Sequence, residues 1–250
     1  MVFRLIAIGL VGGILSGAFG VGGGIVMVPL LVAFAGLDQR QASATSLLAI
    51  LPAAIVGSIT YLAHGSVDLI AAILLAAGAI AGSLIGTWLL SRVPIVVLRW
   101  LFIALVIVTA IRLVFVTPSR AAELPLSPLV IAIYLLVGLA MGISSGLFGI
   151  GGGVIAVPAL VAIVGVSDLV AKGTSLLAMV PTSAVGTWSN WRRGTVSLRT
   201  GIIVGASAAA ASVPGAFLAV AMSPRVSTLL FAALLVLVAV QLSVRAVRGR

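Results

Sequence analysis

Residues 16–29 read Ser-Gly-Ala-Phe-Gly-Val-Gly-Gly-Gly-Ile-Val-Met-Val-Pro, and residues 145–158 read Ser-Gly-Leu-Phe-Gly-Ile-Gly-Gly-Gly-Val-Ile-Ala-Val-Pro. Nine of the 14 positions are identical, and the other five exchange one apolar residue for another. The chain therefore carries the same glycine-rich segment twice, 129 residues apart. Such a break exposes backbone, which is costly inside an apolar stretch unless another group uses it.

The duplication extends beyond the glycines. The same offset relates residues 45–52 to 174–181, which agree at six of eight positions. We interpret the chain as a single membrane domain, 1–250, that contains two repeats. The first repeat covers residues 1–116, the second covers 128–250, and the proline-containing stretch 117–127 is the linker.

Composition restricts the fold class. The chain is 62% hydrophobic and 7% charged, with a mean hydropathy of +1.40, which excludes an ordinary soluble domain. The apolar runs are continuous rather than alternating, which argues against a β-barrel. We therefore expect an all-α polytopic membrane protein.

Each repeat contains five apolar segments, 8–10 in all depending on how the short ones are counted. A helix that spans alone needs about 20 residues, so the segment after each glycine-rich break is too short. These two short segments are either half-helices of re-entrant hairpins near the midplane or short helices that complete two crossings, and both alternatives stay open. The segments are 3–18, 24–36, 43–63, 68–90 and 95–116, followed by 128–146, 152–165, 173–191, 196–221 and 225–245.

Both alternatives give an odd number of crossings per repeat, so the second repeat is expected to be inverted relative to the first. The formal charge of +10 is consistent with this, because ten basic residues fall on one side of the membrane and four on the other. Under the positive-inside rule this bias places both termini in the cytoplasm, and it explains the charge without nucleic acid. The inner set is Arg4, Arg40, Arg92, Arg99, Arg192, Arg193, Arg199, Arg245, Arg248 and Arg250, and the outer set is Arg112, Arg120, Lys172 and Arg225.

The two glycine-rich segments are candidate binding elements. A short helix beginning near Gly24, and another near Gly153, would present unpaired N–H groups and the positive end of its dipole at membrane depth. Two such ends facing one central region suit an anion. A phosphate-binding loop is excluded because no Lys-Ser/Thr follows. The alternative is that the glycines only allow close helix packing, as we expect at Gly78, Gly82 and Gly86. The candidate binding residues here are Gly22, Gly23, Gly24, Gly151, Gly152 and Gly153.

Hydroxyl groups recur beside these elements. The pairs Thr45-Ser46 and Thr174-Ser175 are predicted to begin membrane helices. Their hydroxyls can donate to a ligand or cap their own helix, and both alternatives stay open. Ser16 and Ser145 have the same ambiguity.

One polar group breaks the repeat symmetry. Asn190 aligns with Tyr61, about one turn inside the end of its span, and is a candidate substrate contact. We interpret its neighbours as an interfacial aromatic belt with positive-inside charges, and the alternative is an anion vestibule on the cytoplasmic side. These neighbours are Trp188, Trp191, Arg192 and Arg193.

The scarcity of reactive residues excludes several classes of function. With no Cys, one His and four carboxylates, we expect neither a metal site nor a cofactor. No span offers a nucleophile–base pair, so we do not expect an enzyme. No carboxylate lies in the middle of a span, so a cation substrate lacks a counter-charge and proton coupling lacks an obvious carrier. The carboxylates are assigned to junctions at Asp38, Asp68, Glu123 and Asp168.

The duplicated Gly-x-Phe-Gly-[Val/Ile]-Gly-Gly-Gly-x-x-x-Val-Pro, with the following Thr-Ser-Leu-Leu-Ala…Pro, resembles the sulfite exporter TauE/SafE family. The motifs lie at Gly17–Pro29 with Thr45–Pro52 and at Gly146–Pro158 with Thr174–Pro181. The resemblance covers nearly the whole chain. It implies a permease of the bacterial inner membrane for sulfite, sulfonates or other small anions. The absence of Cys separates the chain from thiosulfate carriers that use cysteines.

These observations lead to one main hypothesis. We expect a transporter for a small inorganic or organosulfur anion, such as sulfite or a sulfonate, that works by alternating access of two inverted repeats. An anion channel with the same site and a non-transporting membrane scaffold are the alternatives. The expected partners are the anion and the lipid bilayer, and not nucleic acid. Proton coupling, a homodimer, and the direction of transport stay open.

Overall fold

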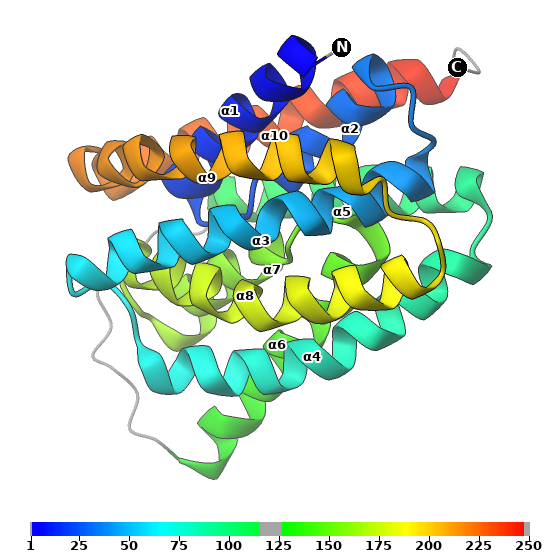
Figure 1. The fold of residues 1–250 in the computed structure, drawn as a ribbon. Helices are drawn as coiled ribbons and strands as arrows, with labels where there is room; N and C mark the ends of the chain where they lie inside the picture. The colour runs from blue at the N-terminus through cyan, green and yellow to red at the C-terminus, as the bar shows by residue number, and fades with distance from the viewer. Residues whose placement is uncertain (1, 116–126, 248–250) are drawn as a thin grey trace.

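The computed structural model describes residues 2–115 and 127–247, and within these ranges every regular element is helical (Figure 1). The expected all-α fold class is therefore confirmed. The first repeat forms α1 (Val2–Phe19), α2 (Gly24–Phe34), α3 (Gln39–Ala63), α4 (Leu69–Arg92) and α5 (Ile95–Phe115). The second forms α6 (Pro128–Phe148), α7 (Gly153–Ala159), the π-helical turn η1 (Leu160–Val164), α8 (Asp168–Arg192), α9 (Leu198–Ala221) and α10 (Pro224–Val247).

Seven helices of the described chain are long and apolar enough to cross a membrane. They are α1, α3, α4, α6, α8, α9 and α10. Large apolar side chains cover the outside of the bundle; Phe3 is 83% exposed and Ile73 is 68% exposed. A surface of this kind fits a lipid environment, so the chain is a multi-pass membrane protein. Apart from Ser127, which caps α6, the predicted linker lies outside the described residues.

Two helices begin earlier than hydropathy predicts. Asp38 caps α3 by accepting the N–H of Gln41 (2.8 Å), and the Gln41 side chain accepts the N–H of Asp38 in return. Ser167 caps α8 by accepting the N–H of Val170 (3.3 Å). The prediction that Thr45-Ser46 and Thr174-Ser175 begin these helices is therefore wrong, because the capping residues lie further upstream and both pairs lie in the second turn.

Each glycine-rich break reverses the chain. One cluster of buried side chains joins Leu5 near the start of α1, Leu31 near the end of α2 and Ala42 near the start of α3. The equivalent cluster in the second repeat joins Val130 of α6, Val164 of η1 and Ala171 of α8. The helices on either side of each break therefore form a hairpin that returns to its starting end, as both arrangements left open by the sequence require.

The two repeats interlock through close backbone contacts. α1 packs along α9, where a β-carbon added at Gly13 would collide with the carbonyl oxygen of Ala208. α6 packs along α4 in the same way, with Gly142 against the carbonyl oxygen of Ala79. These two contacts are related by the offset of 129. The expectation that Gly78, Gly82 and Gly86 serve packing is confirmed, because each lies against a backbone carbonyl of α6.

The equivalent helices α3 and α8 run antiparallel. The Thr45 hydroxyl of α3 accepts the N–H of Ser197, which follows the end of α8, at 3.0 Å. The Thr174 hydroxyl of α8 accepts the N–H of Asp68, which follows the end of α3, at 2.9 Å. The two threonines therefore join the repeats at opposite ends of the bundle.

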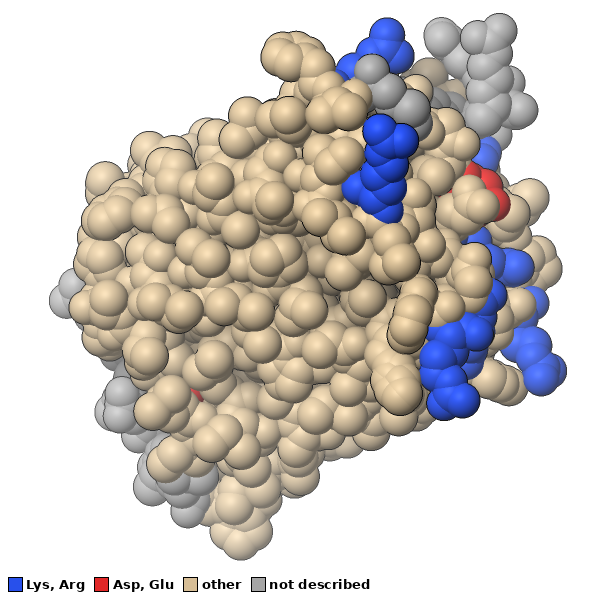
Figure 2. Space-filling view, viewed as in Figure 1, with Lys and Arg blue, Asp and Glu red and all other residues tan. Residues whose placement is uncertain are grey.

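Basic residues concentrate at one end of the molecule. Figure 1 places the starts of α3 and α9 and the ends of α4 and α8 at the same end, on the right. These termini carry Arg40, Arg199, Arg92 and Arg192. The Lys and Arg atoms visible in Figure 2 gather at that end, and the rest of the visible face is almost uncharged.

Candidate functional site

The two glycine turns meet in the interior of the bundle. A β-carbon added at Gly22 would lie 3.5 Å from the Cα of Gly151, and the reverse distance is also 3.5 Å. A β-carbon at Gly24 would collide with the carbonyl oxygen of Gly149, and one at Gly153 with that of Gly20. Segments 129 residues apart are thus in direct backbone contact, which requires glycine on both sides.

The turns also need glycine for their backbone conformation. Gly22 and Gly23 have φ values of 80° and 71°, and Gly151 and Gly152 have values of 82° and 86°. This left-handed region is unfavourable for residues with a β-carbon. Gly23 and Gly152 are also the N-cap residues of α2 and α7, and neither provides a side-chain cap.

The helix starts leave amide groups without acceptors. The N–H groups of Val26 and Met27 donate to the carbonyl oxygen of Gly23, and those of Ile155 and Ala156 donate to that of Gly152. In the part of the chain that the structure describes, the N–H groups of the six candidate glycines have no hydrogen-bond acceptor. These glycines are fully buried, so the site combines unpaired donors with the positive end of the α2 dipole.

Two equivalent apolar side chains enclose the turns. The Met179 Sδ atom of α8 would lie 2.9 Å from a β-carbon at Gly22 and 3.0 Å from one at Gly151. The Ile50 side chain of α3 approaches the first turn in the same way, with its Cγ2 atom 3.2 Å from a β-carbon added at Gly22. The site is therefore closed by α3 and α8 from both repeats, at the middle of these helices.

The predicted serine hydroxyls differ in their hydrogen bonds: one has acceptors in the protein, and three have no partner among the described residues. The Ser46 hydroxyl donates to the carbonyl oxygens of Gly149 (2.6 Å) and Ser43 (2.9 Å), so it binds the second glycine turn. Its equivalent Ser175 is fully buried, and its hydroxyl has no partner among the described residues. Ser16 and Ser145, one turn before the glycine turns, are also buried without a partner for the hydroxyl.

Thr45 and Thr174 contact the other repeat rather than the glycine turns. Each accepts a backbone N–H, as described above, and each keeps a hydroxyl proton for which the described residues provide no acceptor. Asn190 lies near the end of α8 and is 2% exposed, with no partner for its Nδ2. Trp188 and Trp191 are half exposed, as an interfacial belt requires.

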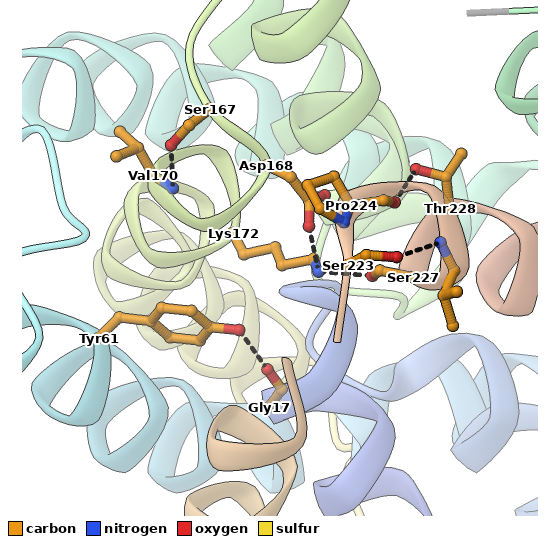
Figure 3. A network of polar contacts seen from close by, with 11 residues as sticks. Gly17, Tyr61, Ser167, Asp168, Val170, Lys172, Ser223, Pro224, Ser227 and Thr228 are labelled. Carbon is orange, nitrogen blue, oxygen red and sulfur yellow. Dashed lines mark hydrogen bonds and ion pairs between the residues drawn. The ribbon is translucent and has the colours of Figure 1, made fainter. Parts of the chain in front are cut away.

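A charged group beside the first glycine turn was not predicted as part of the site. Lys172 is predicted in the outer set of basic residues, in the junction before segment 173–191, but it lies in the second turn of α8 and is only 2% exposed. Its Nζ donates to Asp168 Oδ2 and to Ser227 Oγ, each at 2.6 Å (Figure 3). The nearby Tyr61 hydroxyl donates to the carbonyl oxygen of Gly17 at 2.7 Å. The repeat alignment contains a signal, because Lys172 replaces the neutral Ser43.

Both repeats of the chain are similar in sequence to a known protein family. The sequence profile of the sulfite exporter TauE/SafE family matches residues 1–113 and 134–250, which include both glycine turns. The chain belongs to the TauE/SafE family. No solved structure matches the chain significantly.

Two similar proteins of Bacillus subtilis (strain 168) carry transporter names. "Probable membrane transporter protein YunE" is 27% identical over 216 residues, which cover 77% of this TauE/SafE chain and 79% of the relative. "Probable membrane transporter protein YdhB" is 31% identical over 96 residues, which cover 38% of this chain and 39% of the relative. The chain is therefore a member of a membrane transporter family.

Proposed function

We propose that this chain is a permease that moves a small inorganic or organosulfur anion, such as sulfite or a sulfonate, across the membrane. The observation that carries the proposal is the contact between two glycine turns whose amide N–H groups lack acceptors. Buried donors of this kind are costly unless a ligand accepts from them during the working cycle. The binding set is the six glycines, together with Thr45, Ser46, Thr174, Ser175 and Asn190.

The sign of the substrate charge follows from the donors. Backbone N–H groups and a helix N-terminus favour negative charge. The described carboxylates, Asp38, Asp68 and Asp168, lie at helix starts, and Asp168, which is near the first turn, is paired with Lys172. A cation at the turns would therefore meet no unpaired counter-charge, whereas an anion would find donors on both sides.

The closed centre favours a carrier over a channel. Ile50 and Met179 pack against the turns, and the glycines are buried. A carrier must alternate between states that open to either side, and two repeats of opposite orientation provide two equivalent states. The antiparallel course of α3 and α8 supports such an inverted arrangement. The basic end is proposed to face the cytoplasm of a bacterial inner membrane, with both termini on that side.

Transport of radiolabelled sulfite into proteoliposomes tests the proposal. Gly22→Ala and Gly151→Ala place a methyl group against Met179 at positive φ. Their matched controls are Gly65→Ala and Gly194→Ala, which also lie at positive φ (64° and 69°) but face open space. The backbone strain is of the same order at all four positions, roughly 1–2 kcal/mol, so it does not distinguish site from control.

We expect the two site variants to lose at least nine-tenths of the initial rate and the two controls to keep most of it. Equal transport rates for all four variants would show that the glycine turns are not part of the binding site. A wild-type protein that transports no member of a panel of sulfite, sulfonates and other small anions, and is not stabilised by any of them, would instead support the membrane scaffold.

A further inference from the structure

Lys172 is a buried cation that has no equivalent charge in the first repeat, where Ser43 occupies its position. Its Nζ contacts Asp168 on its own helix and Ser227 in the first turn of α10 (Figure 3). In the first repeat the equivalent positions are Gln39, Ser43 and Leu98, which are neutral. There the start of α3 is joined to the α4–α5 junction by Arg40, which donates to the carbonyl oxygen of Val93. The buried pair of a lysine and a carboxylate is therefore specific to the second repeat.

The surroundings of Lys172 are unfavourable for a cation. Asp168 and Lys172 lie in the first turns of α8, and Ser227 lies in the first turn of α10. Helix N-termini carry partial positive charge, and burial of an ion pair costs desolvation energy that its attraction often does not recover. Two helix starts and one ammonium group form a positive region that a single carboxylate, Asp168, neutralises in this structure. A region of this kind is suited to a second negative group.

The same region adjoins the proposed binding site. A β-carbon at Gly20 would lie 2.6 to 2.9 Å from the Cα, Cβ and Cγ atoms of Lys172, so the lysine stem lies along the first glycine turn. Ser175 follows three residues later on the same face of α8, fully buried and without a partner for its hydroxyl. Its equivalent Ser46 reaches the carbonyl oxygen of Gly149, which is the equivalent of Gly20.

We propose that Lys172 is the cationic binding residue for the transported anion, and that the carboxylate of Asp168 occupies its ammonium group until the anion displaces it. The inference rests on the proposed function and names the charged residue of that site. The ammonium group has three protons, of which Asp168 and Ser227 use two, and its four-carbon stem can turn toward Gly20. A sulfite or sulfonate group has several oxygens, which can accept from Lys172, from the Ser175 hydroxyl and from the free amides together.

Two variants separate binding from a purely structural role. Asp168→Asn removes the competing carboxylate, so we expect the KM for sulfite to fall at least threefold and turnover to fall because release is slower. A structural ion pair predicts instead an unchanged KM and a less stable protein. The double variant Asp168→Leu with Lys172→Met removes both charges, a change that buried ion pairs often tolerate.

We expect the double variant to stay folded, to lose stabilisation by sulfite in thermal unfolding, and to transport at least tenfold more slowly than wild type. Gln39→Leu, at the position equivalent to Asp168, is the matched control and should transport normally. A double variant with a KM for sulfite within twofold of wild type would overturn the role of Lys172 while leaving the transporter proposal intact. If the double variant does not fold, an unchanged or raised KM in Asp168→Asn overturns it. Failure of the wild type to bind or transport any anion of the panel overturns both proposals together.

Discussion

Ser46 and Ser175 occupy equivalent positions but differ in their hydrogen bonds. Ser46 donates to the carbonyl oxygen of Gly149, whereas the Ser175 hydroxyl has no partner in the described chain. Ser46→Ala should therefore destabilise the protein by about 1–3 kcal/mol, because it leaves a buried acceptor unsatisfied. Ser175→Ala removes no hydrogen bond and should leave thermal unfolding in detergent nearly unchanged, while lowering anion transport severalfold.

The two serines control for each other, because the substitution and the helix environment are the same. Equal destabilisation by both variants would mean that Ser175 also has a protein partner. A Ser175→Ala variant with normal stability and normal transport would show that its hydroxyl does not contact the anion.

Sequence reasoning located the residues of the site better than their roles. The glycine residues were found because an exact offset duplicates them, and the structure brings the two copies into contact. The contacts of Thr45 and Thr174 with the other repeat could not be read from the sequence, because their partners, the amides of Ser197 and Asp68, are more than 100 residues away. Lys172 was missed for the same reason, since Ser227 lies 55 residues further along the chain. Periodicity does not reveal such distant partners.

Small residues on α1 and α6 determine how the hairpins pack. Gly13→Ala and Gly142→Ala would each press a methyl group against a backbone carbonyl, of Ala208 and Ala79 respectively. Backbone cannot yield as a side chain can, so each variant should lose about 1–3 kcal/mol of stability. Thermal unfolding of the purified protein in detergent measures the loss, which should be similar for the two equivalent sites.

Gly57→Ala is the matched control for Gly13→Ala and Gly142→Ala. Gly57 is also a buried glycine within a helix, but the atom nearest to a β-carbon added there is Leu176 Cδ1, the end of a flexible side chain, at 3.1 Å. The gain in helix propensity, up to about 1 kcal/mol, should offset the small displacement. If Gly57→Ala were as harmful as Gly13→Ala, general crowding rather than backbone contact would explain the loss.

Helix positions were predictable from hydropathy, but their starts were not. Segment 43–63 was predicted from its apolar residues, whereas α3 begins at Gln39 because Asp38 and Gln41 form a capping box. Residues 38–41 are all polar, so the hydropathy pattern does not indicate that a helix begins there. The backbone conformation of the break after α1 was also undetermined, because Gly22 and Gly23 adopt positive φ there and composition shows only that glycine permits it.

At the scale of the whole molecule, the equivalent helices α3 and α8 run antiparallel, as an odd number of crossings per repeat predicts. Counting alternate sides along the sequence assigns ten basic residues to one side, and the helix termini that carry Arg40, Arg92, Arg192 and Arg199 lie at one end of the bundle (Figure 1). Packing of α1 on α9 and of α6 on α4 then interlocks the repeats. Interlocking could not be read from either repeat alone, because each hairpin packs against a helix of the other.

An inverted arrangement places the equivalent junctions α4–α5 and α9–α10 on opposite sides of the membrane. Arg40 at the start of α3 donates to the carbonyl oxygen of Val93 in the first junction, whereas Lys172 near the start of α8 contacts Ser227 just after the second. The chain contains no cysteine, so a single introduced cysteine reports its own location. Ser91→Cys and Ser223→Cys are suitable because both serines are exposed and the change is nearly isosteric.

With a membrane-impermeant maleimide added to intact bacterial cells, we expect Ser223→Cys to react and Ser91→Cys to react only after the membrane is opened. The positive-inside rule fixes this direction, since Arg92 and Arg99 flank the first junction and Arg225 alone follows the second. Reaction of both cysteines from the same side would contradict the inversion and, with it, alternating access by symmetric exchange. Reaction of Ser91→Cys alone in intact cells would keep the inversion but reverse the orientation, so that the basic end would face outward.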